Sequence, residues 1–367
     1  MKKYDERETL FSRISLKKGS KEYKEFYNKN RNKKADDDKQ RGISFRNNLR
    51  KDDRFKNLFF PLTKNNKEYI KTVFDMAERK QVNTKRITIE PYFSSNLKEI
   101  AKYYGATDVG IVKLSDYSYY SHQGGLSEAV NISNYNEKVK PKYNTAIVYT
   151  ILMDKEKINR APNFEELLAT EEAYLQVATV GSRLTVYLKE LGYKAMFNHS
   201  EFYYAPLVPL AYDAGLGEIG MCNHIVTKKY GNNVRLGAVF TNLVVNYDKP
   251  IDFGLTEFCK KCALCLSNCP SGAIKHHPRV VNGRQFYKFD ENKCFDMWIK
   301  SGTDCGTCIS TCPFTQGIDL SKIDKIKDNP LIIDDIIKDF TSKHGRRVYQ
   351  KEELDIVKVE VKNAKDN

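Results

Sequence analysis

The chain has 367 residues, a length typical of two or three domains. A hydrophobic fraction of 41%, with 12% aromatic residues, is enough for a packed core and excludes a disordered chain. Lys and Arg outnumber Asp and Glu by 61 to 47, and the net charge of +14 fits either a lysine-rich surface or attraction to an acidic partner, such as nucleic acid or an acidic electron carrier.

No run of about 18 or more apolar residues occurs, so we expect no membrane span. The segment MKKYDERETLFSRISLKKGSKEYKEF has neither an apolar run after its charges nor a twin arginine. We therefore expect no export signal and a cytoplasmic protein. In such a protein, clustered cysteines more often bind metal than form disulfides, and this chain has nine.

The chain divides by composition into four parts. Residues 1–56 are dense in charged side chains and are expected to form a solvated N-terminal extension. Residues 57–250 alternate helical and strand patterns, which predicts an α/β (α+β) catalytic domain. Residues 251–320 hold the clustered cysteines. Residues 321–367 are expected to contain a helix, over 331–344, and a loosely held charged tail.

Periodicity predicts the main elements of the second part. Short runs rich in β-branched residues predict strands over 86–92, 109–114, 145–153 and 234–245. Residues 164–191 predict a long helix with Asn163 as its N-cap and Gly192 as its C-terminal stop. One face of this helix is expected to carry Tyr174, Val177, Ala178, Gly181, Thr185 and Leu188.

The cysteines follow the spacing of a bacterial two-cluster ferredoxin. Residues 258–274, FCKKCALCLSNCPSGAI, contain C-x-x-C-x-x-C-x-x-x-C-P, and residues 305–313 repeat the end of this pattern. Two-residue gaps direct successive thiolates at one cube, while the cysteine before proline turns toward the other cube. The spacing predicts two 4Fe–4S clusters, one held by Cys259, Cys262, Cys265 and Cys312, the other by Cys269, Cys294, Cys305 and Cys308.

Two features of the cysteine pattern leave alternatives. A pair of zinc sites is disfavoured because zinc sites close on four ligands and do not need the trailing Cys-Pro. Cys294 is the least secure ligand because its spacing to Cys305 is long, and Cys222 lies outside both groups and is expected to be a buried thiol.

Residues 215–220, GLGEIG, match the glycine pattern of dinucleotide sites. Such a site needs the pattern between a strand and a helix, whereas here a helical segment precedes it and no strong helix follows. The glycines instead indicate a tight turn or a close backbone approach to a bound group. Gly215, Leu216, Gly217 and Glu218 are therefore candidates for cofactor binding.

The order of AGLGEIG (214–220), YGNNVRLGAVFTNL (230–243) and the two cysteine motifs resembles the corrinoid-dependent reductive dehalogenase family. The resemblance implies a nitroreductase-like domain that binds cobalamin in its base-off form and a ferredoxin-like section that passes electrons to cobalt. It also implies removal of a halide from an organohalide, with a tyrosine as proton donor. By position, the tyrosine falls on Tyr174 and its basic partner on Arg235, while Ser200 and Asn198 are candidates for a further polar group.

Other functions remain open at this point. The motif D-x-H-x-x-G, which often places a histidine on cobalt, is absent. This absence is compatible with base-off binding without a protein ligand, and it is equally compatible with a protein that binds no corrinoid. Epoxyqueuosine reductase is a related alternative that acts on tRNA, which the positive charge would suit, although an aspartate is expected there in place of Tyr174. A non-catalytic electron-transfer protein is another alternative. In the main interpretation, a low-potential ferredoxin or flavodoxin docks on a basic face near the second cluster.

Overall fold

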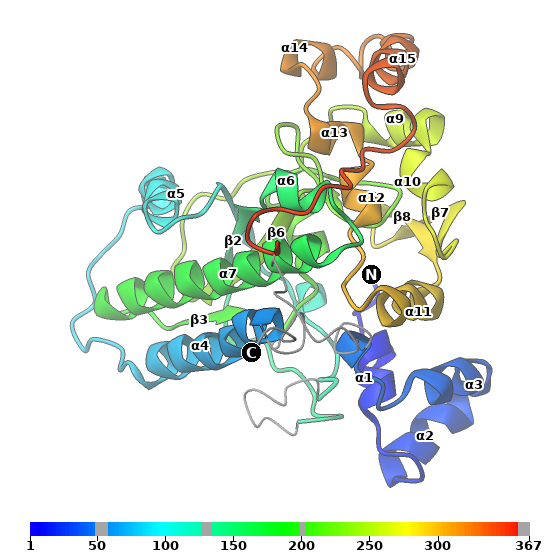
Figure 1. Cartoon of the computed structure of the whole chain (residues 1–367). Coiled ribbons are helices and arrows are strands. Elements are labelled where there is room, and N and C mark those ends of the chain that lie inside the picture. The colour runs from blue at the N-terminus through cyan, green and yellow to red at the C-terminus, as the bar shows by residue number, and fades with distance from the viewer. Residues whose placement is uncertain (48–57, 126–133, 199–202, 359–367) are drawn as a thin grey trace, which may run out of the picture.

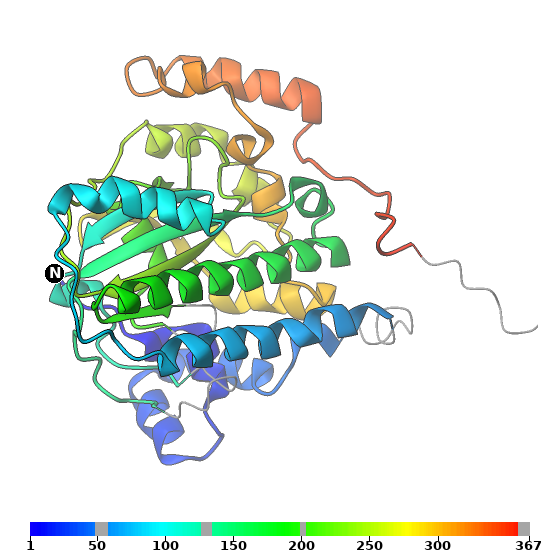
Figure 2. The same cartoon turned by 90° about the vertical axis from the view of Figure 1, so that its left-hand side faces the viewer.

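A computed structural model of the chain describes residues 1–47, 58–125, 134–198 and 203–358 (Figure 1, Figure 2). Its centre is a four-stranded antiparallel sheet in the order β1-β2-β6-β3. The strands are β1 (Asp108–Lys113), β2 (Thr145–Leu152), β3 (Ala195–Asn198) and β6 (Val234–Thr241). Among the residues described, none of the helices is long and apolar enough to cross a membrane.

Helices cover both faces of this sheet, and the alternation of side chains along a strand explains how. Ile147 and Tyr149 of β2 pack with buried residues of helices on one face, while Ala146 and Val148 pack on the other. The first face is covered by α4 (Phe60–Arg79), α5 (Ser94–Tyr103) and α7 (Phe164–Glu190), and the second by α8 (Leu207–Asp213). The mixed helix-and-sheet fold expected from the sequence is confirmed.

Helix α7 confirms the long helix predicted over 164–191, and it lies beside α4 (Figure 1, Figure 2). Asn163 occupies the N-cap position without a side-chain cap bond, and Gly192 follows the helix with a φ of +85°. A Cβ on Gly181 would lie 2.7 Å from the Tyr149 hydroxyl oxygen, so only glycine allows the helix to approach the sheet this closely. This contact fixes the position of α7, which carries Tyr174.

The strand predicted over 86–92 is wrong. Ile87 is 45% exposed, and its N–H donates to the carbonyl of Leu191 at the end of α7. The segment therefore runs beside a helix terminus, where its β-branched side chains have no sheet face to cover. The other strands are confirmed, although β6 ends at Thr241 rather than 245 and Val244 is 52% exposed.

The cysteine section folds as short helices around a β-hairpin, and the prediction of a helix over 331–344 is confirmed by α15. The elements in order are β4 (Glu218–Ile219), β5 (Ile225–Val226), α9 (Leu255–Cys262), α10 (Leu264–Ser267), β7 (Ile274–Val281), β8 (Arg284–Phe289), α11 (Glu291–Ser301), α12 (Thr307–Ser310), α13 (Pro313–Gln316), α14 (Leu320–Ile323) and α15 (Ile332–His344). The short α6 (Lys155–Ile158) precedes α7.

Residues 1–47 form helices rather than a loose chain, and these helices contact the cysteine section. They comprise η1 (Glu6–Glu8), α1 (Leu10–Ser15), α2 (Lys21–Lys29), α3 (Arg31–Gln40) and η2 (Phe45–Asn47). Phe11 packs edge-on against Phe295 of α11, with ring centroids 5.5 Å apart. The division of the chain into four parts stays a prediction, but the charged first part is folded where the structure describes it.

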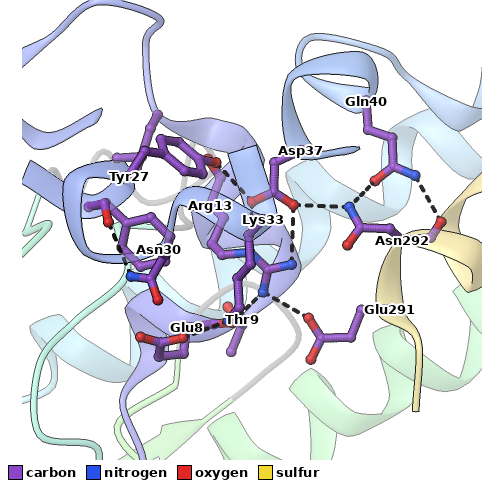
Figure 3. Close-up of polar contacts among 12 residues, drawn as sticks. Glu8, Thr9, Arg13, Tyr27, Asn30, Lys33, Asp37, Gln40, Glu291 and Asn292 are labelled. Atoms are coloured by element: carbon purple, nitrogen blue, oxygen red, sulfur yellow. Dashed lines mark hydrogen bonds and ion pairs between the residues drawn. The ribbon is translucent and has the colours of Figure 1, made fainter. Parts of the chain in front are cut away.

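A buried ion pair holds the N-terminal helices together (Figure 3). Arg13 Nε donates to Asp37 Oδ2 at 2.9 Å, and the two side chains are 2% and 0% exposed. Asp37 also accepts from the Tyr27 hydroxyl and the Asn292 amide, each at 2.9 Å. Arg13 Nη1 donates to Glu291 Oε2 at 2.8 Å. Because Asn292 and Glu291 belong to α11, the same network joins the N-terminal helices to the cysteine section.

Candidate functional site

An open cavity of about 1020 Å³ lies where the sheet domain, the N-terminal helices and the cysteine section meet. Tyr174 and Arg235 line it from the sheet domain, and Arg13 lines it from the N-terminal helices. The cysteine section contributes Phe289 and Ile309, which lies between two of the cysteines. The cavity therefore places the predicted proton donor and its basic partner beside the section predicted to hold clusters.

Tyr174 and Arg235, predicted to act together, do lie together. The guanidinium carbon of Arg235 on β6 lies 4.8 Å from the centroid of the Tyr174 ring on α7. Burial raises the pKa of the Tyr174 hydroxyl above its ordinary value, while the positive charge of Arg235 opposes this rise. The phenol is thus held protonated near neutral pH, next to a cation that would stabilise its phenolate.

Three side chains that the sequence reasoning did not select hold Arg235 in place. Its Nη2 donates to Thr170 Oγ1 at 2.7 Å and to Asp304 Oδ2 at 2.9 Å. Glu166 lies behind them, fully buried, and its Oε1 accepts from the Thr170 hydroxyl at 3.2 Å. Burial would lower the pKa of Arg235, but the nearby Tyr174, Asp304 and Glu166 raise it above its usual value.

The carboxyl of Glu166 is held in an unusual environment. Burial and the neighbouring Asp304 carboxylate raise the pKa of Glu166 well above its ordinary value, against the opposing effect of Arg235. A signal for this group was present in the sequence. Glu166, Thr170 and Tyr174 are spaced by four residues, which puts them on one face of a helix. Asp304 directly precedes Cys305, so the same network contacts the second cysteine motif.

Of the two further polar candidates, Asn198 is described by the structure and is not among the described residues that line the cavity. Asn198 is fully buried at the end of β3, where its Oδ1 accepts from the Tyr204 N–H at 2.8 Å. Its Nδ2 has no hydrogen-bond partner among the described residues. Ser200 lies outside the described residues. The roles proposed for both stay predictions.

The glycine loop packs against its own chain. A Cβ on Gly217 would lie 2.2 Å from the Val226 carbonyl oxygen, and one on Gly215, whose φ is +72°, would lie 2.5 Å from that of Lys249. Leu216 is buried, and Glu218 Oε2 accepts from the N–H groups of two residues near the start of α9, Phe253 at 2.7 Å and Leu255 at 3.2 Å. None of the four candidates lines the large cavity. Their assignment to cofactor binding stays a prediction, and close packing within the chain accounts for both glycines.

The cysteines predicted to hold the first cluster gather around one small cavity. Its walls include the side chains of Cys259, Cys262, Cys265 and Cys312, together with the apolar rings of Phe258 and Phe314. Burial raises the pKa of Cys259, Cys262 and Cys312, and at Cys265 the neighbouring Cys222 is the larger cause of a raised pKa, followed by burial. Four cysteines around one cavity are the set of ligands that one 4Fe–4S cluster takes.

The second predicted set is also brought together. Cys305 and Cys269 are close enough to Cys294 to raise the pKa of its thiol. Cys294 and Cys305 are likewise close enough to raise the pKa of Cys308. Cys222 is buried as expected, but in space it lies between the two sets rather than away from them. Cys222 lines the same small cavity as Cys265 of the first set and Cys308 of the second. The Asn232 amide donates to the Cys222 sulfur at 3.4 Å.

Comparison with known proteins agrees with this geometry. Residues 258–316 match the family described as the 4Fe-4S dicluster domain, so the chain contains a section of this type. It is 37% identical over 179 residues to tetrachloroethene reductive dehalogenase of Sulfurospirillum multivorans, which covers 47% of this chain and 35% of that protein. The protein of the same name from Dehalobacter restrictus is 31% identical over 189 residues, covering 48% and 34%. Over about half of its length, the chain is thus similar in sequence to proteins named reductive dehalogenases.

Two further similarities complete the comparison. Epoxyqueuosine reductase of Atelocyanobacterium thalassa is 33% identical over 112 residues, which cover 28% of this chain and 35% of that protein. The solved structure of the catabolic reductive dehalogenase NpRdhA in complex with 3-bromo-4-hydroxybenzoic acid superposes with a TM-score of 0.73 at 19% identity, over 94% of this chain and 47% of that one. This likeness shows the shared fold. The matched region spans about a third of the length of the curated relatives and about half of NpRdhA.

Proposed function

We propose that the protein is a corrinoid-dependent reductive dehalogenase of the cytoplasm. Electrons pass through two 4Fe–4S clusters to a base-off cobalamin, and Tyr174 supplies a proton as a halide leaves an organohalide. The observation that carries the proposal is the pairing of Tyr174 with Arg235 in a cavity that also reaches the cysteine section. The relatives named as tetrachloroethene reductive dehalogenases support the substrate class.

The cavity fits a corrinoid in size and in the character of its walls. Its volume of about 1020 Å³ lies at the upper end of the ~300–1,000 Å³ usual for small-molecule sites, as a ligand much larger than most substrates requires. Leu207, Leu236 and Phe289 offer apolar contacts to a macrocycle, and the His224 ring offers a hydrogen bond to its amide side chains. A bound corrinoid supplies the low-valent cobalt chemistry that breaks a carbon–halogen bond.

The residues of the chain supply and manage the proton. Replacing a halide by hydrogen consumes two electrons and one proton and releases the halide ion. The raised pKa of Tyr174 keeps its proton in place until the substrate carbon becomes basic. The guanidinium of Arg235 then stabilises the phenolate that remains. Thr170 and Asp304 fix the direction of that guanidinium through their hydrogen bonds.

The electron donor proposed is a low-potential ferredoxin or flavodoxin, both of which are acidic carriers. The net charge of +14 favours such a partner. The donor is proposed to dock on a basic face near the second cluster. Reduction of the clusters by such a donor should slow as ionic strength rises, and a rate independent of salt would refute the electrostatic part of this proposal.

A second candidate function is the reduction of epoxyqueuosine in tRNA, because a protein named epoxyqueuosine reductase is 33% identical over 112 residues. The positive charge is compatible with a tRNA substrate. The Tyr174–Arg235 pair favours the dehalogenase, since the alternative is expected to use an aspartate as its acid. Assaying both substrates with the same preparation separates the two functions.

The test begins with anaerobically reconstituted protein mixed with cobalamin. Electron paramagnetic resonance should detect two reducible cubane clusters and a base-off cobalt(II) signal, and halide release should follow from a panel of organohalides. Tyr174→Phe should lower turnover by about 10²- to 10⁴-fold, the usual contribution of a general acid, while cluster and corrinoid signals are kept. Tyr187→Phe, on the same helix but outside the cavity, is the matched control. Clusters with only free, base-on cobalamin would refute the enzyme and leave an electron-transfer protein.

A further inference from the structure

The mouth of the cavity carries three cations on one β-hairpin. Lys275 and Arg279 lie on β7 and Lys288 lies on β8, and all three line the cavity. Arg279 pairs with Phe286 across the hairpin, and residues 286 and 288 share a face because side chains alternate along a strand. Arg279, Phe286 and Lys288 therefore point to the same side, toward the cavity, while Lys275 lies beyond an irregularity in the register.

These cations keep their charge available. Within the described part of the chain, neither Lys275, Arg279 nor Lys288 forms an ion pair with a carboxylate. The acidic residues that line the same cavity are already engaged. Glu291 accepts from Arg13 at 2.8 Å, and Asp290 Oδ1 accepts from the Lys293 N–H at 3.1 Å, where it caps α11. The hairpin thus presents net positive charge to whatever enters the cavity.

The hairpin face also carries an aromatic ring. Phe286 lies beside Arg279 and Lys288 and lines the cavity with them. Cations next to aromatic rings suit a ligand that carries an anionic group close to a flat ring. Arg and Lys bind phosphate oxygens with charge-assisted hydrogen bonds, and an aromatic face binds a heterocycle by stacking.

We propose that the face of the β7–β8 hairpin bearing Lys275, Arg279 and Lys288 binds the phosphodiester of the nucleotide tail of the corrinoid, with Phe286 against its heterocyclic base. This assignment rests on the proposed function. It divides the cavity into two ends: Tyr174 and Arg235 serve the reacting end, and the hairpin holds the tail. In this arrangement the tail base is held away from cobalt, which is what base-off binding requires.

The test compares cobalamin with cobinamide, which has the same corrin ring and cobalt but lacks the phosphodiester and the base. Both dissociation constants are measured by absorbance titration for the anaerobic holo-iron–sulfur protein. The wild-type protein should bind cobalamin at least tenfold more tightly than cobinamide, as one charge-assisted hydrogen bond would give. The double variant Arg279→Gln/Lys288→Gln should bring this ratio toward one through weaker cobalamin binding, with cobinamide binding unchanged.

The double variant Lys293→Gln/Lys325→Gln is the matched control, since it removes the same charge from exposed lysines that do not line the cavity. An unchanged ratio in the hairpin variant would overturn the assignment. The assignment would also be overturned if the hairpin variant bound both corrinoids normally but was reduced by ferredoxin more slowly and with less dependence on salt. That result would make the hairpin a docking surface for the electron donor. If the wild-type protein binds neither corrinoid, the proposed function fails instead, and the two failures are distinguishable.

Discussion

Replacing Arg13 by methionine should release the N-terminal helices from the cysteine section. The change leaves the Asp37 carboxylate, which is 0% exposed, with only the neutral Tyr27 hydroxyl and Asn292 amide as donors. Removing one partner of a buried ion pair costs about 3–5 kcal/mol because it leaves an uncompensated charge. The contact with Glu291 adds little to this figure, since that side chain is 46% exposed.

The loss of stability should be confined to the N-terminal helices, so native-state hydrogen exchange of α1 and α3 is the suitable measurement. Arg13→Met should lower the free energy of opening of these helices by about 3–5 kcal/mol while exchange in the central sheet is unchanged. Lys21→Gln, which removes an exposed pair with Glu25 on α2, should change neither. Equal protection of α1 and α3 in wild type and Arg13→Met would show that the pair does not hold the helices in place.

Three further predictions concern single buried groups. Burial raises the pKa of Glu6 to about 7, so the folded protein binds a proton at this carboxyl more strongly than the unfolded protein does. The free energy of unfolding should therefore fall by roughly 3 kcal/mol as pH rises from about 4.5 to 7. Glu6→Gln should remove this fall in urea titrations at several pH values, and a fall of the same size in the variant would contradict the assignment. Cys294→Ala should reduce bound iron from about eight to about four per chain, and full iron content would mean that another group is the ligand. Cys222→Ala should keep all the iron, because neither predicted ligand set includes Cys222, and iron loss would identify Cys222 as a ligand.

The sequence predicted those features that depend on local spacing. Gaps of two and three residues between cysteines and the closing prolines identified the dicluster section, because that geometry is set within a few residues. Helix α7 followed from its periodicity and from Gly192. The pairing of Tyr174 with Arg235 came from the family resemblance, not from any pattern near either residue.

Contacts between distant segments were beyond that reasoning. Asp304 reaches Arg235 only because the cysteine section folds back over β6, and nothing near either residue encodes that approach. The neighbours of Cys222, at positions 265 and 308, are likewise set by the fold. Residues 86–92 have a strand-like composition but run beside the end of α7, because tertiary position overrides a weak local preference.

The hydrogen bonds between the N-terminal helices and α11 have a consequence for how the protein folds during its synthesis. During translation, the partners at 291 and 292 leave the ribosome roughly 14 to 56 s after residue 13, at synthesis rates of ~5–20 residues per second. Throughout that interval the N-terminal helices can contact only earlier parts of the chain, as Ser12 does when its hydroxyl donates to the Gly124 carbonyl at 2.8 Å. We expect the wall of the cavity that joins Arg13 to Glu291 to form only after α11 has been made.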